Sequence, residues 1–259
     1  QAVAAGRMGA QVSIISRLGQ DDFAKMALDV WNKSGVKPYV KQSSEDYTGA
    51  AYIFIEESSG DNAIIIAPGA AKKISAEDLQ NRADLISKAD VFVTQLEQPM
   101  EAAVKGLEIA KAAGVKTILN PAPAADLPDG MLELCDFITP NETETEAITG
   151  VSVASIEDAN NASKVLKSMG VGTPIITLGE KGAYLYGHGL VEAFITGPVL
   201  ETTGAGDAFN GGFATALSEG MTSLEAVKMG CATAGISVTR AGTAPSMPIR
   251  SEVDKLIYR

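Results

Sequence analysis

The stretch VFVTQLEQPMEAAVKGLEIAKAAGVKTIL, residues 91–119, contains one complete strand–helix–strand unit. Its two ends, 91–94 and 117–119, are short runs of β-branched and apolar residues that favour strands. The segment between them, 99–113, has the length and the apolar spacing of a helix. Strands that alternate with such helices pair in parallel, because the helix carries the chain back across the sheet. This stretch therefore predicts an α/β fold.

The same alternation continues on both sides of this unit. We expect a mostly parallel central sheet with helices on both faces. No linker, repeat or low-complexity tract divides the chain, so we expect one domain over 1–259. The expected upstream elements are a helix from residue 1 that ends at Gly9, a strand over 12–16, a helix over 21–33, a β-hairpin with strands over 51–56 and 62–67, and a helix over 75–88. The expected downstream elements are a strand over 137–139, a short acidic helix from Asn141, a helix over 156–169, a strand over 174–178 with a hairpin turn at 179–182, and helices over 206–218, 223–240 and 250–258.

The hairpin carries an apolar face on which Tyr52, Phe54, Ile64 and Ile66 lie together. The Glu57–Asp61 connection has the residues of a tight turn. Two strands alone are marginal in water, so this face needs further strands or a partner subunit to cover it.

Composition excludes several classes of function. The chain has 259 residues, with 21 Lys and Arg against 32 Asp and Glu, and a formal charge of −11. This acidic balance argues against a duplex nucleic-acid partner, because phosphate binding needs a cationic face. No apolar run is long enough to span a membrane. The sequence opens as QAVAAGRMG, within a helical pattern and without an initiator Met, so we expect a missing N-terminal segment. It has no signal-peptide pattern, which favours a cytoplasmic protein.

Two cysteines and one histidine limit the chemistry further. Cys135 and Cys231 lie in apolar stretches and are expected to be buried free thiols. His188 lies in a glycine-rich turn. Zinc sites of the Cys/His type and Ser-His-Asp catalysis lack the partners that they need.

The strongest local pattern is ETTGAGDAFNGG, residues 201–212. Gly204 and Gly206 allow a tight turn, and Ala205 keeps it free of bulk. The helix that follows begins with unpaired N–H groups, which suit a phosphoryl group that gains negative charge during transfer. Asp207 is placed to take a proton from an attacking hydroxyl. The alternative is a plain glycine-rich turn in which Asp207 only stabilises the helix N-terminus, and these residues alone leave both interpretations open.

Neither the P-loop pattern nor the Rossmann glycine pattern occurs in the chain. From residue 1 to its end, however, the chain resembles the PfkB family of ribokinase-like carbohydrate kinases. The opening and the segments at 95–97 and 120–124 look most like the ribokinase branch of that family. The resemblance rests on an ordered set of motifs: Gly9, RLGQDDF (17–23), QLE (95–97), NPAPA (120–124), TPNETE (139–144), TLGEKG (177–182) and TTGAGDAFNG (202–211).

The resemblance implies roles for the residues around the phosphoryl group. Asp207 matches the catalytic base, and the N–H groups of Gly204, Ala205 and Gly206 match the anion hole. Glu97 matches a carboxylate of the ribose pocket, although a solvated loop acid is the alternative. Asn120 is expected to support the pocket.

The resemblance also implies a nucleotide site and a magnesium site. Glu144 would order the water shell of Mg²⁺, and the alternative is an acidic helix start that complements the helix dipole. For Thr177, Gly179 and Gly182 the alternative interpretation is an ordinary hairpin turn that binds no ligand. The implied nucleotide-binding residues are Asn141, Thr177, Gly179, Gly182 and Gly206.

A monovalent-cation site, holding K⁺ in the family, is implied next to the anion hole. The sequence departs from the family there, because Glu201 stands where Asp is usual. The matching positions are Glu201, Thr203, Ser237, Arg240, Gly242 and Ser246.

The resemblance therefore implies an ATP-dependent kinase that phosphorylates the 5-hydroxyl of D-ribose, with Mg²⁺ and K⁺. It makes the segment at about 46–67 part of a β lid, through which two subunits pair. The family's first strand and its sugar-binding Asp would precede Gln1. The alternatives are another sugar kinase of the family, acting on fructose or ketodeoxygluconate, or a non-catalytic sugar- or nucleotide-binding fragment.

Overall fold

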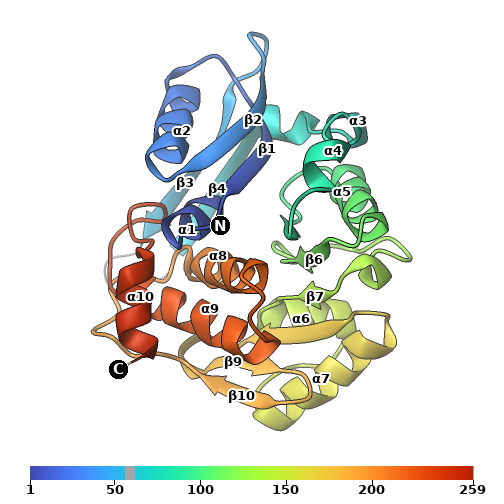
Figure 1. Ribbon diagram of the computed structural model, residues 1–259, viewed down its shortest axis with the longest axis vertical. Coiled ribbons are helices and arrows are strands. Elements are labelled where there is room, and N and C mark those ends of the chain that lie inside the picture. The colour runs from blue at the N-terminus through green and yellow to red at the C-terminus, as the bar shows by residue number, and fades with distance from the viewer. Residues whose placement is uncertain (56–61, 259) are drawn as a thin grey trace.

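The central feature of the computed structural model, which describes residues 1–55 and 62–258, is a six-stranded sheet (Figure 1). Its strand order is β10-β9-β8-β7-β6-β5. Strands β5 to β8 are parallel, whereas β9 and β10 are antiparallel to their neighbours. The sheet confirms the mostly parallel arrangement predicted from the sequence. Its strands are β5 (Val91–Thr94), β6 (Lys116–Leu119), β7 (Phe137–Ile138), β8 (Thr173–Thr177), β9 (Gly182–Leu185) and β10 (Gly189–Glu192).

Helices cover both faces of this sheet, as the sequence predicts (Figure 1). One face is covered by α8 (Ala205–Ser218) and α9 (Ser223–Ser237), and α10 (Arg250–Ile257) packs on α9. The other face is covered by α5 (Met100–Ala112), α6 (Glu142–Thr149) and α7 (Ile156–Ser168). No helix of the described residues has both the length and the apolar composition that a bilayer crossing requires.

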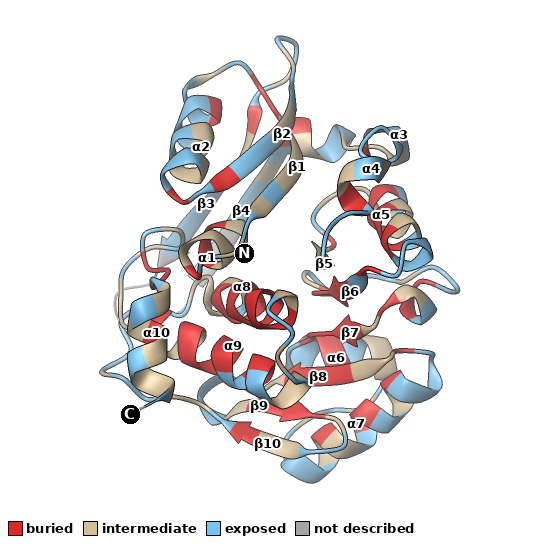
Figure 2. Ribbon diagram, viewed as in Figure 1, coloured by how far each residue is buried: buried red, intermediate tan, exposed pale blue. Residues whose placement is uncertain are grey.

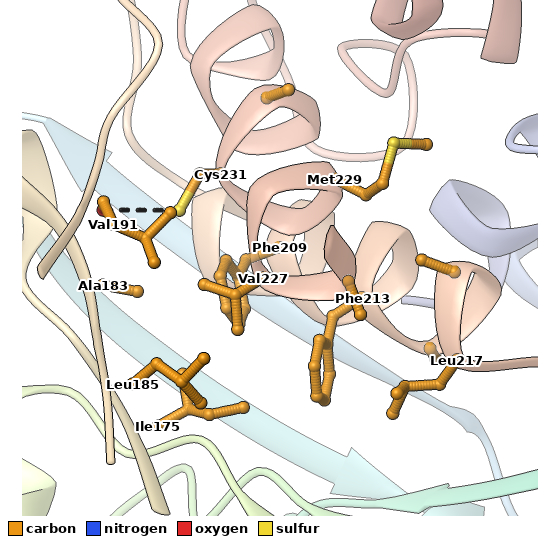
Figure 3. Close-up of a cluster of buried hydrophobic side chains, with 14 of the residues drawn as sticks. Ile175, Ala183, Leu185, Val191, Phe209, Phe213, Leu217, Val227, Met229 and Cys231 are labelled. Carbon is orange, nitrogen blue, oxygen red and sulfur yellow. Dashed lines mark hydrogen bonds between the residues drawn. The ribbon is translucent and has the colours of Figure 1, made fainter. Parts of the chain in front are cut away.

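Helix α8 is buried along almost its whole length (Figure 2). Phe209 and Phe213 point from it toward the sheet residues Ile175 and Leu185 (Figure 3). A Cβ atom at Gly211 would lie 2.4 Å from the Cβ of Ala4, which belongs to α1 (Ala2–Arg7). A Cβ atom at Gly212 would lie 2.3 Å from Oγ1 of Thr233 on α9. These glycines let α1 and α9 pack closely against α8, so its position is fixed from two sides.

A second, two-stranded sheet pairs β1 (Val12–Leu18) in parallel with β2 (Val36–Gln42). Helix α2 (Asp22–Lys33) connects the two strands. The sequence predicted β1 and α2 but missed β2, whose sequence VKPYVKQ contains a proline and two lysines. Such residues are typical of an edge strand, in which apolar alternation is weak.

The predicted hairpin forms a separate antiparallel sheet of β3 (Thr48–Ile55) and β4 (Asn62–Gly69). Both strands extend further toward the hairpin base than the sequence predicted. The prediction that Tyr52, Phe54, Ile64 and Ile66 share one face is wrong, because the register places Tyr52 opposite Ile65 and Ala51 opposite Ile66. Tyr52, Phe54 and Ile65 lie on one face and are more than half exposed, whereas Ile66, also more than half exposed, lies on the other. The predicted turn at 57–61 and the side chain of Ile64 lie outside the described residues.

The single helix expected over 75–88 is wrong. The structure has two short helices, α3 (Ala76–Gln80) and α4 (Ala83–Ile86), separated at Asn81 and Arg82. The N–H of Arg82 donates to the carbonyl of Leu79 at 3.0 Å, which tightens and ends the first helix. The guanidinium of Arg82 then lies over the ring of Tyr39 at 5.3 Å. This contact with β2 favours the break, and the local sequence could not reveal it.

Candidate active site

The N-terminus of α8 carries the glycine-rich motif. Gly204 caps the helix with a φ of +82°, a conformation that requires glycine. At Gly206 the backbone places no such demand, and a Cβ atom there would meet nothing within 4 Å. The missing side chain of Gly206 therefore leaves open space directly in front of the helix N-terminus.

The three N–H groups predicted to form the anion hole differ in whether they already have a hydrogen-bond acceptor. The N–H of Ala205 donates to the carbonyl of Thr202 at 3.1 Å, so the turn itself uses this donor. For the N–H groups of Gly204 and Gly206, the described residues provide no acceptor. Two unpaired donors at a positive helix end favour an anionic ligand.

Two carboxylates from different elements lie near these donors. Asp207 is in the first turn of α8, and its side chain is 47% exposed. Glu97 follows β5 and is exposed. Partial desolvation raises the pKa of Glu97, and the nearby Asp207 carboxylate raises this pKa further. The structure thus brings together the predicted base and the predicted sugar-binding carboxylate.

Hydrogen bonds hold the loop that carries Glu97. Gln98 Nε2 donates to Oγ1 of Thr94 at 2.8 Å and also to the carbonyl of Gln95. Gln1 Nε2 donates to Oδ1 of Asn120 at 2.8 Å, and Gln1 Oε1 accepts from the Gln95 side chain. Asn120 follows β6, so these bonds connect the carboxyl ends of two neighbouring parallel strands.

A buried pair that the sequence analysis did not select links the sheet to α8. Thr139, after β7, donates from Oγ1 to Oδ1 of Asn210 on α8 at 2.8 Å. Asn210 Nδ2 donates to the carbonyl of Gly206 at 2.9 Å. The sequence did hold one signal for this pair. Asn210 lies in the mostly small and apolar helix sequence AFNGGFATAL, and a buried polar side chain there needs a hydrogen-bond partner.

Asn141 and Glu144 form a reciprocal cap at the start of α6. Asn141 Oδ1 accepts from the N–H of Glu144 at 2.8 Å, and Glu144 Oε2 accepts from the N–H of Asn141 at 2.9 Å. Asn141 therefore precedes the helix as its cap, and Glu144 lies in the first turn. Burial raises the pKa of Glu144, and the Asn141 N–H partly opposes this rise. The cap supports the alternative of an acidic helix start, and the described residues contain no group of three or more His, Cys, Asp or Glu arranged for a metal ion.

The predicted nucleotide turn lies next to this cap. Thr177 donates from its N–H, at 2.9 Å, to the carbonyl of Pro140, which directly precedes Asn141. Gly179 and Gly182 have φ values of +52° and +109°. A Cβ atom at Gly182 would also lie 2.1 Å from the carbonyl oxygen of Val191. The hairpin itself accounts for both glycines, and the structure brings Asn141 and Thr177 onto adjacent loops.

The predicted cation residues gather where the 200–203 segment meets the end of α9. Glu201 Oε2 accepts from the N–H of Gly242 at 2.7 Å. Ser237 and Ser246 are buried in the same region. The Arg240 guanidinium pairs with Glu252, so only the Arg240 backbone can face a cation. This cluster adjoins the anion hole, since a Cβ atom at Gly204 would lie 3.4 Å from Cβ of Thr243.

Two open cavities lie elsewhere, beside β1 and β2. Their volumes are about 360 and 290 Å³, and Lys41 lines both. None of the predicted site residues lines either of them. The predicted site instead lies at the carboxyl ends of the parallel strands, the usual position of ligands in such sheets.

Comparisons with known proteins show the family of this chain. A model of the pfkB family of carbohydrate kinases matches residues 1–250. The ribokinase of Haemophilus influenzae is 41% identical over 256 residues, which cover 97% of this chain and 83% of that protein. A deoxyribokinase of Salmonella typhi is 36% identical over 253 residues, covering 96% of this chain and 82% of that protein. The solved structure of Arabidopsis thaliana ribokinase complexed with ribose and ATP superposes with a TM-score of 0.90 at 29% identity, covering 98% of this chain and 84% of that chain.

Proposed function

Because the chain belongs to the pfkB family of carbohydrate kinases, we propose that it transfers the γ-phosphate of ATP to the 5-hydroxyl of D-ribose, giving ribose 5-phosphate. The observation that carries this proposal is the start of α8. There, two N–H groups without acceptors lie beside the open space at Gly206 and the Asp207 carboxylate. An attacking hydroxyl, a base and an anion site are the parts that this reaction needs.

Each residue of this site has a defined task in the proposed reaction. Glu97 binds ribose hydroxyls and orients the sugar. Asp207 accepts the proton of the 5-hydroxyl while that oxygen forms a bond to the γ-phosphorus. The bond between the γ-phosphorus and the β–γ bridging oxygen breaks, and ADP leaves. The N–H groups of Gly204 and Gly206 stabilise the charge that develops on the phosphoryl oxygens.

The nucleotide and Mg²⁺ occupy the neighbouring loops in this proposal. Asn141, Thr177, Gly179 and Gly182 line the nucleotide, together with Gly206. The cap at α6 uses Oε2 of Glu144, and this leaves Oε1 for a hydrogen bond to a metal-bound water. Oxygen donors of this kind suit Mg²⁺, which keeps several waters and neutralises phosphate charge when bound.

A monovalent cation fits the cluster around Glu201. Its donors are one carboxylate, the hydroxyls of Thr203, Ser237 and Ser246, and backbone carbonyls of the 240–246 turn. A set of neutral oxygens with one carboxylate suits K⁺. Because the cluster adjoins Gly204, a bound ion would stabilise the turn that forms the anion hole. We expect activity in KCl to exceed activity in LiCl for the wild type, and a Glu201→Gln variant to lose this difference.

The exposed apolar face of β3 and β4 supports a homodimer in which a second copy covers Tyr52, Phe54 and Ile65. We further propose that the enzyme acts in the cytoplasm, where ATP is available. Sedimentation of the wild type and of a Tyr52→Ser/Phe54→Ser variant tests the dimer. We expect a dimer for the wild type and a monomer for the variant, and two identical profiles would argue against the lid as the interface.

The Salmonella relative favours one second substrate. Its name specifies deoxyribose, so 2-deoxy-D-ribose belongs beside D-ribose among the acceptors. The two sugars differ only at the 2-hydroxyl, and the ratio of their kcat/KM values measures how strongly the site binds that group.

The decisive experiment is an ADP-release assay with ribose, 2-deoxyribose, fructose and ketodeoxygluconate. We expect ribose to give the highest kcat/KM. An Asp207→Asn variant keeps the shape of the side chain but loses its basicity, so kcat should fall by roughly 10²–10⁴-fold while ATP affinity stays the same. Equal turnover in the variant would remove Asp207 from the mechanism, and preference for another sugar would reject the ribose assignment.

A further inference from the structure

Asn210 is a buried polar residue with both ends of its amide engaged. It is 1% exposed and lies one helical turn after Gly206 on α8. Its Oδ1 accepts from Oγ1 of Thr139 at 2.8 Å, and its Nδ2 donates to the carbonyl of Gly206 at 2.9 Å. The amide therefore bridges the end of β7 and the first turn of α8.

The direction of this bridge is fixed by its chemistry. The carbonyl of Gly206 can only accept, so the amide nitrogen of Asn210 must face it. Oδ1 then faces Thr139, whose hydroxyl must donate. Thr139 is itself held by the sheet, since its N–H donates to the carbonyl of Leu119 at 3.0 Å and its carbonyl accepts from Asn120 Nδ2 at 3.3 Å.

The peptide group that this bridge holds is the one that carries the predicted base. The carbonyl of Gly206 and the N–H of Asp207 belong to the same planar unit. Gly206 has no side chain, and its Cβ position faces open space, so side-chain packing does not fix that unit. The Asn210 amide supplies the contact that the glycine lacks.

Another polar side chain of α8, that of Thr215, makes a similar bond without a link to the sheet. Thr215 Oγ1 donates to the carbonyl of Gly211 at 2.8 Å, four residues earlier in the same helix. That bond begins and ends in the helix core and reaches no strand. The bond from Asn210 to Gly206 has the same spacing, but a side chain of the central sheet orients its donor.

We propose that Thr139 and Asn210 are positioning residues for phosphoryl transfer, which hold the 206–207 peptide so that the anion hole and Asp207 keep their relative geometry. This inference rests on the proposed function. It assigns the end of β7 a part in catalysis through α8, without contact with either substrate.

The test compares three single variants and one double variant. Thr139→Val removes the hydroxyl donor without changing the shape of the side chain. Thr139→Ser keeps the hydroxyl and removes only the methyl group. Thr117→Val is the matched control, because Thr117 is a fully buried threonine of β6 whose hydroxyl bonds Leu134 and Asp136 at the other end of the sheet. Thr139→Val/Asn210→Leu replaces both partners with apolar groups, which removes the unpaired buried amide oxygen.

We expect Thr139→Val to lower kcat by roughly 10- to 100-fold, as small misplacements of reacting groups do, with the KM values for ribose and ATP within about twofold of the wild type. Thr139→Ser should recover most of kcat. Thr117→Val should lower the melting temperature and leave kcat unchanged. The double variant should regain stability but stay slow, which a purely structural role does not predict.

Hydrogen exchange of the segment 204–211 gives a readout that is independent of the sugar. It should quicken in Thr139→Val and in the double variant but not in Thr117→Val. If the wild type phosphorylates no sugar, the proposed function fails, and this exchange still decides whether the bridge holds the turn. Unchanged exchange and a kcat within twofold of the wild type in Thr139→Val would overturn the inference, as would full recovery of kcat in the double variant.

Discussion

Gly204 and Gly206 lie two residues apart and are needed for different physical reasons. The backbone of Gly204 is left-handed, so any other residue strains the turn. Gly206 has an ordinary backbone conformation and empty space at its Cβ position. Folding therefore explains the first glycine, whereas only a ligand approaching the helix N-terminus explains the second.

A Gly206→Ala variant should separate folding from function. Alanine in a helix is favoured over glycine by about 0.5–1 kcal/mol, so the free energy of unfolding should stay the same or rise. The added methyl group would fill the space proposed for the phosphoryl group, and kcat should fall by roughly tenfold or more, since one donor of an anion hole is worth about 10²–10³-fold.

The control is Gly204→Ala, which should lower stability by about 1–2 kcal/mol because of its positive φ. Thermal melting and the ADP-release assay measure both effects. Full activity of Gly206→Ala would mean that no group approaches the helix there.

Sequence and structure agree unevenly at the scale of single residues. The glycine-rich motif and the QLE motif predicted Asp207 and Glu97, and the fold brings the two carboxylates close enough for one to raise the pKa of the other. The Thr139–Asn210 bond was missed because the two residues are 71 positions apart. Its existence depends on the way in which α8 packs against β7, which no local pattern encodes.

At the scale of elements, the start of α6 has two explanations that one variant can distinguish. The cap formed by Asn141 and Glu144 stabilises the helix, and the proposed metal role needs the charge on Glu144. Glutamine can make the same reciprocal cap as glutamate, so it preserves the structural role and removes the charge.

We therefore expect Glu144→Gln to change stability by less than about 0.5 kcal/mol and to raise the Mg²⁺ concentration required for half-maximal rate. Added magnesium should restore much of the activity, and ribose affinity should be unchanged. Loss of ribose affinity that magnesium does not restore would contradict the metal role. Asn141→Ala serves as the control for cap loss, with an expected cost of about 1 kcal/mol.

The base of the β3–β4 hairpin is anchored by Asp21, which precedes α2. Its Oδ2 accepts from the N–H of Thr48 at 2.7 Å, and its Oδ1 accepts from the N–H of Ala24 at 2.8 Å. The hydrogen bonds from Thr48 and Ala24 hold the pKa of Asp21 below its ordinary value of 3.8. A carboxyl with a lowered pKa stabilises the fold above its unfolded-state pKa, and this contribution is lost as the pH falls through the lowered value.

Asp21→Asn should consequently be less stable than the wild type at pH 7, because the amide lacks the charge that these N–H groups favour. The difference should shrink as the pH falls below 3.8. Urea unfolding at a series of pH values measures it. Asp29→Asn, at an exposed position on the same helix, should show no such trend, and a pH-independent difference for Asp21→Asn would contradict the argument.

The elements that the sequence predicted are those with strong local patterns. The strand–helix–strand unit at 91–119 and the helices of the C-terminal part lie within a few residues of their predicted positions. The polar strand β2 and the break between α3 and α4 depend on contacts such as that of Arg82 with Tyr39. Those contacts form only after the chain has folded.

At the scale of the whole molecule, the two cysteines lie in the hydrophobic layers on opposite faces of the central sheet. Cys135 lies in the cluster with Leu107 and Leu166, beneath α5 and α7, and Cys231 lies in the cluster beneath α8 and α9. Burial raises the pKa of each thiol to about 12. A buried, protonated thiol is a poor nucleophile.

We expect neither thiol to react with a disulfide reagent in the native protein at pH 8, and both to react in denaturant. The reaction rate of each thiol should follow the opening of its own layer, which mass spectrometry of the labelled peptides resolves. Cys135→Ser and Cys231→Ser assign the two rates. Rapid labelling of either cysteine in the native state would show that its helical layer is open to solvent.

The pairing of Thr48 with Gly69 at the base of the β3–β4 hairpin bears on how such a fold can change over evolutionary time. The chain leaves the α/β core at Thr48 and returns beside the same point at Gly69, so everything between them is a detour in the path of the backbone. A single in-frame insertion or deletion in the gene could lengthen, shorten or exchange that detour without moving any strand of the central sheet. Lineages that share the central sheet can therefore diverge in this hairpin while the underlying scaffold is inherited intact.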